Sequence, residues 1–198
     1  MRQTSKLSFI TFFPCKINLK DYFKVMSKRI DHIEENAPVS SQDFRNAMSQ
    51  FAGAVNIVTT DGEKGKRGLT VSACCSLSDN PATVLVCLMH NREENRLFVE
   101  NGKFCLNTLS GNHQKLSDAF SGKDNLSQEQ RFALANWDIL KTGAPVLKNS
   151  LVSFDCQLVE WFQHTTHYVL VGQVVALQTN DAEEALIYLN RSYHKVEI

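Results

Sequence analysis

The stretch AVNIVTTDGEKGKRGLTVSACCSL, residues 54–77, contains two runs of strand-forming residues around a glycine-rich turn. Ala54–Thr60 is rich in β-branched side chains and ends at an Asp-Gly dipeptide, which is typical of turns. Gly62–Gly68 holds three glycines and three basic residues, and Leu69–Leu77 then returns as a second strand-like run. The pattern predicts two strands that are joined by a basic hairpin loop.

Further strands are predicted downstream of this hairpin. Thr83–Leu88 is a continuous apolar run, typical of a strand that is buried on both faces, and Phe104–Leu109 is another strand. Leu151–Leu158 alternates between apolar and polar residues, which predicts a half-buried strand. Tyr168–Leu177 is the last long strand. Many short strands that are separated by turns favour a closed or nearly closed β-barrel with peripheral helices.

Helices are predicted at a few places around these strands. One opens at Ser40 or Ser41, because Ser40 with Asp43 three residues later resembles a capping box. Its apolar residues recur at helical spacing; they are Phe44, Met48 and Phe51. Three short helices are also predicted, over Asn95–Glu100, over Gln114–Phe120 and at the C-terminus after a cap at Asp181.

The length and charge of the chain bound its class. The 198 residues fit one domain, which we place at 40–198, with an N-terminal extension at 1–39. Lys plus Arg equals Asp plus Glu at 21 each, so no broad positive field exists to hold nucleic acid or an anionic membrane. An anionic ligand must therefore be held locally, by a few side chains and backbone N–H groups. No apolar run approaches the roughly 20 residues of a spanning helix.

The extension and the cysteines indicate a cytoplasmic protein. Leu7–Phe13 loosely mimics a signal peptide, but Pro14-Cys15-Lys16 offers no small-residue cleavage site, so we interpret it as non-targeting. Translation from Met26 is a hypothesis that N-terminal sequencing tests. None of the six cysteines forms a C-x-x-C pair, which favours buried, reduced thiols.

The standard nucleotide, nucleophile and metal motifs are missing. Three glycines at 62, 65 and 68 have the wrong spacing for a dinucleotide fold, and no P-loop or G-x-S-x-G is present. His164 and His167 would point to opposite faces of a strand, so they cannot share a metal unless a turn lies between them. We predict no metal site, and one of these histidines lining a pocket is the preferred interpretation.

Two polar groups are candidates for ligand binding. Thr70 and Ser72 lie two apart, so on a strand both hydroxyls project from one face beside the basic loop. They suit a phosphate or a ring carbonyl, or they are ordinary strand residues. Asn91, Arg92 and Asn95 are donors in the loop that leaves the buried strand, where a ligand or plain solvent could meet them.

Aromatic and cationic residues also gather near the C-terminus. They are Tyr188, Arg191, Tyr193 and His194. Such residues pack on a nicotinamide or adenine ring, or they simply dock the predicted final helix, which is the simpler reading.

Several short stretches follow one another in a characteristic order over about residues 43–196. They are Phe44–Met48, Ala54–Thr60, Gly68–Ser72, Cys75–Asp79 with Pro81, Val86–Leu88, Asn101–Lys103 with Cys105 and Asn107, Pro145–Leu147 with Ser150 and Leu151, Thr166-His167, and Leu186–Tyr188 with Arg191 and His194. Taken in this order, they resemble the short-chain flavin reductase family, and more closely the reductase component of 4-hydroxyphenylacetate 3-monooxygenase.

The resemblance implies a mainly β, Greek-key FMN-binding split barrel with peripheral helices, which forms a homodimer. The activity it implies is NADH- or NADPH-dependent reduction of FMN or FAD, and reduced flavin then diffuses to a separate oxygenase. The flavin residues that it implies are Gly68, Thr70, Ser72, Cys87, Leu88, Met89, Asn91, Asn95 and Phe120, with Asn91 and Asn95 near the phosphate end. The nicotinamide residues are His167, Tyr188 and Arg191. No protein nucleophile or other obligatory catalytic residue is expected, because the redox chemistry belongs to the two cofactors.

The chain departs from the family pattern in two loops. Thr165-Thr166 stand where the family has Gly-Asp before the histidine, and the hydroxyphenylacetate branch also has Thr there. Arg92, Glu93 and Glu94 occupy positions where many relatives have serines, and carboxylates near a phosphate are unfavourable unless they point away. The phosphate contacts and the choice between FMN and FAD are therefore open. The alternatives are a non-catalytic split barrel that binds flavin or haem, and an enzyme similar to pyridoxamine-phosphate oxidase.

Overall fold

The computed structural model describes residues 38–198. The chain divides into residues 1–43 and 44–198, and every strand of the described part belongs to the second unit. The predictions on the signal-like segment and on Met26 lie outside the described residues. The boundary at residues 39 and 40 stays a prediction.

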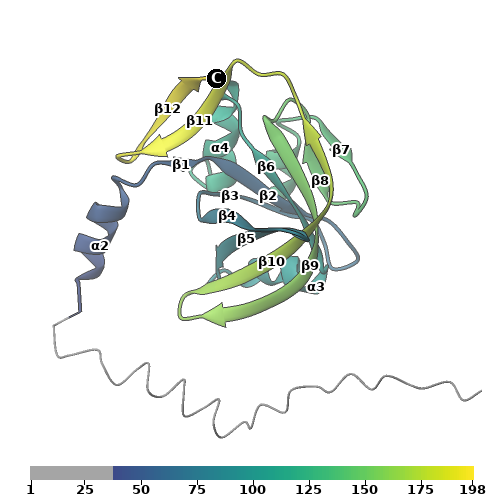
Figure 1. Cartoon of the computed structure of the whole chain (residues 1–198), viewed down its shortest axis with the longest axis horizontal. Helices are drawn as coiled ribbons and strands as arrows, with labels where there is room; N and C mark the ends of the chain where they lie inside the picture. The colour runs from purple at the N-terminus through teal and green to yellow at the C-terminus, as the bar shows by residue number, and fades with distance from the viewer. Residues whose placement is uncertain (1–37) are drawn as a thin grey trace, which may run out of the picture. The chain divides into compact units, whose positions relative to one another are not determined.

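An antiparallel seven-stranded sheet dominates the unit 44–198, in the order β3-β2-β6-β9-β10-β5-β4 (Figure 1). Its strands are β2 (Asn56–Thr60), β3 (Arg67–Val71), β4 (Cys74–Asp79), β5 (Ala82–Met89), β6 (Lys103–Thr108), β9 (Val152–His164) and β10 (His167–Thr179). A three-stranded sheet joins β1 (Gly53–Ala54), β11 (Glu184–Leu189) and β12 (Ser192–Glu197). A two-stranded sheet pairs β7 (Trp137–Ile139) with β8 (Pro145–Leu147).

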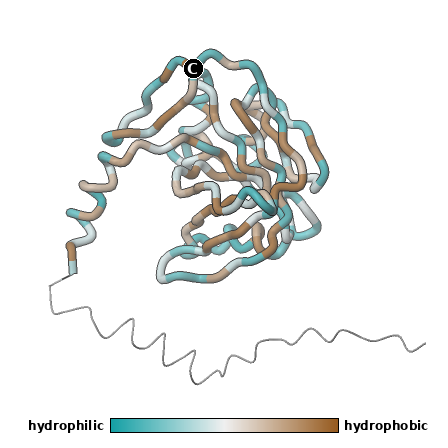
Figure 2. The backbone as a smooth tube through the Cα atoms, in the orientation of Figure 1, coloured by the Kyte–Doolittle hydropathy of each residue, from teal (hydrophilic) through white to brown (hydrophobic). Residues whose placement is uncertain are grey.

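The large sheet curls around one interior. Val58 of β2, Val71 of β3, Val86 of β5 and Leu170 of β10 belong to one buried cluster. Strands from both ends of the sheet pack into the same cluster, which a flat sheet would not allow. Figure 2 shows brown, apolar stretches of chain running through the strands of this unit. The prediction of a mainly β split barrel is confirmed.

Short helices lie around the strands. They are α2 (Ser41–Met48), the 3-10 turn η1 (Glu93–Arg96), α3 (Leu97–Glu100), η2 (Gly111–His113), α4 (Gln114–Ser121) and α5 (Gln128–Phe132). The predicted helices near residues 95–100 and 114–120 are confirmed, as is the cap at Ser40, whose Oγ accepts from the Asp43 N–H at 3.0 Å. In the described part of the chain no helix is long and apolar enough to cross a membrane.

Helix α5 was not predicted, although its sequence signal is present. Ser127 and Gln130 form a full capping box: the Ser127 Oγ accepts from the Gln130 N–H, and the Gln130 side chain accepts from the Ser127 N–H. The S-x-x-Q spacing before an apolar residue could have revealed this helix start.

The predicted C-terminal helix is wrong, because residues 184–197 form the β11–β12 hairpin. Asn190 and Arg191 occupy the turn with φ of 49° and 59°, the conformation that tight hairpins require. Backbone pairing holds the hairpin to the core: the Val55 N–H donates to Leu186 O, and the Leu186 N–H donates to Leu109 O. These long-range hydrogen bonds and the burial of Leu186 stabilise the hairpin more than a cap at Asp181 would stabilise a helix.

The single strand predicted over residues 69–77 is also wrong. The run divides after Val71 into β3 and β4, which lie at the two opposite edges of the sheet. The Ala73 carbonyl accepts from the Cys87 N–H at 2.8 Å, so the chain has already crossed to β5 at that point. Ser72 and Ala73 therefore form a crossing segment between the two edges.

Two of the polar residues on one side of β9, Ser153 and Asp155, are buried, whereas Gln157 further along the strand is exposed. Ser153 donates to Asn107 Oδ1 at 2.7 Å, and Asp155 accepts from the Thr142 N–H at 2.8 Å and from its hydroxyl. The segment that carries Thr142 and Ala144 covers this face, so alternation alone gave the wrong environment. Hydrogen bonds satisfy the polar groups that this burial removes from water.

Gly172 of β10 provides a test of the barrel packing. A Cβ at this position would lie 2.3 Å from Phe104 Cζ and 2.9 Å from Cys156 Cβ, both in the core. We expect Gly172→Ala to lower the free energy of unfolding by about 1–3 kcal/mol through overpacking. Denaturant unfolding measures this loss. The control is Gly53→Ala, whose Cβ would meet Ser72 Cβ at an ordinary 3.5 Å; equal losses in the two variants would contradict the packing argument.

Candidate functional site

Two adjoining cavities open where the chain crosses from β3 to β4. The first cavity has a volume of ≈ 350 Å³ and the second of ≈ 410 Å³, both within the range of small-molecule sites. They share four lining residues, which are Thr70, Val71, Ser72 and Ser121. The end of β3 together with Ser72 thus forms the common wall of both cavities.

The first cavity is built around the end of β5. Cys87, Leu88 and Met89 line it, and the β5–β4 ladder ends where the Cys87 N–H bonds to Ala73 O. Beyond this bond β4 no longer pairs with β5, so the backbone edge of Leu88 and Met89 on that side lies beside the cavity. Phe120 enters from α4, and His167 lies opposite Met89 in the β10–β5 pairing.

Eight of the twelve predicted site residues line this first cavity. They are Thr70, Ser72, Cys87, Leu88, Met89, Asn95, Phe120 and His167. Gly68 and Asn91 do not line either cavity. The other two, Tyr188 and Arg191, line the second cavity, so the predicted nicotinamide residues are divided between the two.

Gly68 affects the site indirectly, because it leaves room for the ring of Phe120. Its Cβ would lie 2.4 Å from Phe120 Cε1, so only glycine lets the ring rest on this strand. The Gly68 N–H donates to the Gln128 side-chain oxygen of α5 at 2.9 Å. Phe120 in turn contacts Phe132 and Trp137 edge to face, which fixes the ring that borders the cavity.

The two predicted hydroxyls differ in their hydrogen bonds. Thr70 donates to the Ser117 carbonyl at 2.7 Å, so its hydroxyl proton is already used and its oxygen is left as an acceptor. Ser72 lies outside β3 and is exposed, and no hydrogen bond joins its hydroxyl to the described residues. The two residues do not share a strand face, but both border the two cavities.

Arginines contribute the charge of the first cavity. Arg67, Arg92 and Arg131 line it, and no ion pair joins any of them to a carboxylate in the described part. Burial lowers the pKa of Arg67; Glu94 opposes this effect, and the neighbouring charges of Arg131 and Arg92 add to it. Arginine remains protonated in proteins, so the cavity carries a local positive charge in a chain of zero net charge. Glu93 and Glu94 are exposed and line neither cavity.

Sequence reasoning placed Arg67 in a basic hairpin loop and missed Arg131 altogether. Arg67 is the first residue of β3 and is only 8% exposed. An arginine beside glycines gives no sequence signal for burial. Arg131 belongs to the helix that was not predicted, and the capping box at Ser127 was the available clue.

His167 has one ring nitrogen engaged locally. Its Nδ1 lies 2.8 Å from the Thr166 hydroxyl, which leaves Nε2 without this partner. His164 and His167 face each other across the β9–β10 turn, which Thr165 makes with φ of 45°. Among the described residues no group of three or more His, Cys, Asp or Glu side chains is arranged to hold a metal ion.

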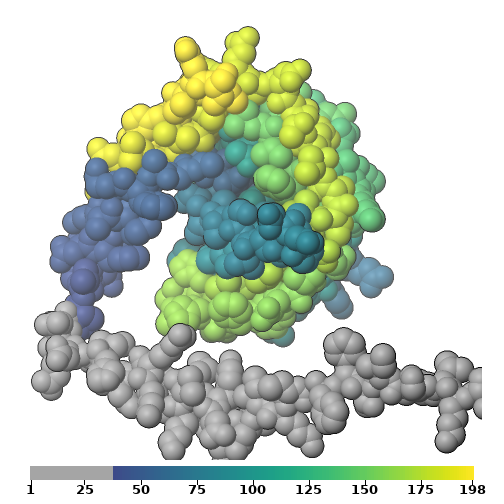
Figure 3. Space-filling model, in the orientation of Figure 1, coloured from purple at the N-terminus to yellow at the C-terminus, as the bar shows by residue number. Residues whose placement is uncertain are grey.

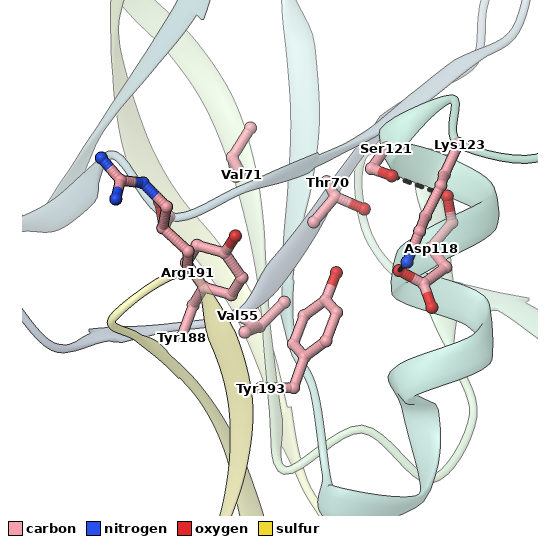
Figure 4. A pocket seen from close by; sticks show the side chains of 10 residues that line it. Val55, Thr70, Val71, Asp118, Ser121, Lys123, Tyr188, Arg191 and Tyr193 are labelled. Carbon is pink, nitrogen blue, oxygen red and sulfur yellow. Dashed lines mark hydrogen bonds and ion pairs between the residues drawn. The ribbon is translucent and has the colours of Figure 1, made fainter. Parts of the chain in front are cut away.

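The second cavity lies between the β11–β12 hairpin and α4 (Figure 4). The rings of Tyr188 and Tyr193 pack edge to face with their centroids 5.3 Å apart, and the Tyr193 hydroxyl lies 2.9 Å from Ser117 Oγ. Burial raises the pKa of Tyr193. From α4 and the turn after it, Asp118 and Lys123 form an ion pair of 3.3 Å on the opposite wall. Aromatic rings, hydroxyls and cations here suit a polar molecule that carries a ring.

Cys87 is the one described cysteine that lines either cavity, and its thiol is a poor nucleophile. Burial raises the pKa of Cys87. This thiol therefore favours the protonated form, whereas covalent catalysis by cysteine requires the thiolate. The site offers binding and orientation rather than a protein nucleophile.

The chain matches known proteins over most of its length. The model of the family described as "Flavin reductase like domain" matches residues 48–197. A protein named FMN reductase (NADH) RutF from Agrobacterium fabrum is 47% identical over 80% of this chain and 90% of its own length. The protein of the same name from Pantoea ananatis is 45% identical over 81% of this chain and 84% of its own.

A solved structure shares the fold over the same region. It is a crystal structure of a putative flavin reductase from Haemophilus somnus, with 43% identity and a TM-score of 0.76, and it covers 80% of this chain and 100% of that protein. The family match, the relatives and the shared fold all span the barrel that carries both cavities. The chain therefore belongs to the flavin reductase-like family.

Proposed function

We propose that this chain is an NADH-dependent FMN reductase that releases reduced flavin to a partner monooxygenase. The observation that carries the proposal is the lining of the first cavity, which combines a strand edge, hydroxyls, a fixed phenyl ring and three arginines. A flavin mononucleotide needs each of these: surfaces for a planar ring, polar groups for its edge and chain, and cations for its phosphate. The names of the relatives, FMN reductase (NADH), favour FMN over FAD and NADH over NADPH.

In this proposal the predicted flavin residues have distinct tasks. The end of β5 at Cys87–Met89 supplies backbone groups to the ring, and Thr70 and Ser72 supply hydroxyl oxygens along it. Gly68 acts indirectly, since it positions Phe120. Asn91 is exposed outside both cavities, so its contact with the flavin phosphate has the least support.

NADH would enter through the second cavity. Tyr188 and Arg191 line that cavity, while His167 borders the first, and the shared wall at Thr70–Ser72 joins the two. A molecule that spans both cavities would bring its nicotinamide beside the flavin ring. The two cofactors supply hydride transfer, and the protein residues bind them, hold the rings in register and exclude water.

NADH oxidation tests the function directly. Purified chain is mixed with NADH, and the loss of NADH absorbance is followed while FMN, FAD or riboflavin is added. Oxidation that rises with added flavin supports the reductase. Flavin or haem that binds tightly without NADH oxidation would instead favour the non-catalytic binder, and oxidation of pyridoxamine phosphate would favour the third alternative.

His167 provides a residue-level prediction. We expect His167→Ala to raise the KM for NADH by about tenfold, roughly 1.4 kcal/mol, while the FMN dissociation constant changes less, because the side chain borders the nicotinamide rather than the flavin phosphate. Steady-state kinetics at saturating FMN measure the first effect, and fluorescence titration measures the second. The matched control is His164→Ala, which faces His167 across the hairpin and lines neither cavity. An unchanged KM in His167→Ala would refute this placement.

We also propose a homodimer, which the tip of the β9–β10 hairpin supports. The ladder between β9 and β6 ends at Gln157, and one further bond joins the Leu158 N–H to Gly102 O. Beyond Leu158 no described strand pairs with the outer edge of β9. Val159, Trp161 and Phe162 are each about half exposed there, and Leu77 of β4 is 53% exposed. In Figure 3 this hairpin and β4 lie together on the visible face. An open strand edge with exposed apolar residues is typical of an interaction surface.

Phe162 tests this dimer. We expect Phe162→Glu to weaken self-association by more than tenfold, because a charge would be buried in an apolar contact. Analytical ultracentrifugation measures the mass. The neighbouring Gln163→Glu adds the same charge at a polar position and should remain dimeric. A Phe162→Glu variant with the mass of the wild type would contradict this surface.

The partner and the cell compartment are further proposals. The resemblance favours an oxygenase of the 4-hydroxyphenylacetate type, whereas the relatives above carry a different name, RutF. A separate oxygenase is given its aromatic substrate, O2, NADH and FMN; product that forms only when the reductase is added would support this supply role. All five described cysteines are free thiols, which supports a reducing compartment such as the cytoplasm.

A further inference from the structure

We propose that Arg67, oriented by Asn95 and assisted by Arg92 and Arg131, binds the phosphate of the flavin and makes the site select phosphorylated flavins over riboflavin. The proposal rests on the proposed function, because it assigns the anion-binding part of the same cavity. It also changes the predicted role of Asn95 from a phosphate contact to a positioning residue.

Arg67 is a buried cation without an anion in the described structure. The residue is only 8% exposed, and it lines the first cavity. Only its Nε has a hydrogen bond, to Asn95 Oδ1 at 3.2 Å, and no carboxylate lies within ion-pair distance among the described residues. A guanidinium has five N–H donors, so its two terminal nitrogens are left to bind a ligand. Burying an unpaired charge is costly, and a bound anion would offset that cost.

Both polar atoms of the Asn95 side chain are already engaged by the protein. It is 1% exposed; its Oδ1 accepts from Arg67, and its Nδ2 donates to the Met89 carbonyl at 2.8 Å. The side chain thus connects the end of β5 to the Arg67 guanidinium, which aims the arginine relative to the strand edge. Asn95 acts on the ligand through Arg67.

Two more arginines complete the positive charge. Arg131 is held by a hydrogen bond from its Nε to the Leu126 carbonyl at 2.9 Å, so its terminal nitrogens are directed elsewhere, and Arg92 lies on the loop after β5. Both are close enough to Arg67 to act on it electrostatically, and Glu94 is the one carboxylate that does so. Three cations with one exposed carboxylate suit a phosphate monoester, which carries about −1.5 to −2 at pH 7. Guanidinium groups bind phosphate oxygens in pairs, which adds geometric selectivity.

Flavin binding in the absence of NADH tests the clamp. The chain is titrated into FMN and into riboflavin, and quenching of flavin fluorescence gives the two dissociation constants. We expect the wild type to bind FMN at least tenfold more tightly than riboflavin. Arg67→Met should remove most of this preference by weakening FMN at least tenfold and riboflavin less than twofold. Equal loss for both flavins, or no loss for FMN, would overturn the proposal.

Arg96→Met is the matched control. Arg96 lies in η1, next to Asn95, but its side chain is 69% exposed, pairs with Glu100 and lines neither cavity. Arg96→Met removes the same charge and should leave the preference for FMN over riboflavin, measured as the ratio of the two dissociation constants, unchanged. A preference that falls as far as in Arg67→Met would show a diffuse charge effect and overturn the clamp. Asn95→Ala should lower the ratio in the wild type but not further in Arg67→Met, as expected for a positioning residue.

A measurement on the wild-type chain tests the clamp even if a variant does not fold. Inorganic phosphate should compete with FMN but not with riboflavin, and equal effects on both flavins would overturn the clamp. The clamp and the proposed function fail separately: selective FMN binding without NADH oxidation would refute the reductase alone, and NADH oxidation that is equally efficient with riboflavin and FMN would refute the clamp alone.

Discussion

The division of one strand-forming run between two edges of the same sheet is the constraint on which this structure depends. β3 pairs with β2 at one edge, and two residues later β4 pairs with β5 at the other edge. A chain can make this crossing only if the sheet curls until its edges approach each other. The same crossing closes the interior around Val58, Val86 and Leu170 and leaves an opening along Ser72 and Ala73. The site is therefore a consequence of how the barrel is closed.

Close backbone approach around aromatic rings supports this geometry. Phe104 rests against Gly172 inside the barrel, and Phe120 rests against Gly68 at the site. In each case the absence of a Cβ lets a large ring fill space that a side chain would occupy. On the other side of the sheet, the hydrogen-bonded cluster of Asn107, Ser153 and Asp155 fixes β6 and β9 without leaving polar atoms unsatisfied. This ring packing and this hydrogen-bonded cluster hold the strands on which the position of the crossing segment depends.

The sequence was informative where local pattern and tertiary structure agree. The β-branched runs, the turn glycines and the Ser40 cap predicted most strands and several helices. The pattern failed where distant partners decide: residues 184–197 form strands because Leu186 docks on Val55 and Leu109, and Ser153 is buried because a distant loop covers it. For the site, strand alternation and resemblance brought most of the predicted residues together. They could not identify Arg67, whose role depends on a contact with Asn95, 28 residues away.

The proposed phosphate site gathers its positive charge locally, which is how a chain of zero net charge can select an anion. A broad positive surface would attract many polyanions, whereas here the positive charge is gathered in one cavity, and no ion pair joins its three arginines to the described carboxylates of the loop. Screening by salt is weaker for partly buried charges than for exposed ones, so a small cluster is effective at short range. The ring end of the site, by contrast, offers a strand edge and an open wall that is shared with the second cavity. A ligand that is held firmly at its charged end and loosely along its ring is suited to bind, to be reduced beside its partner, and to leave.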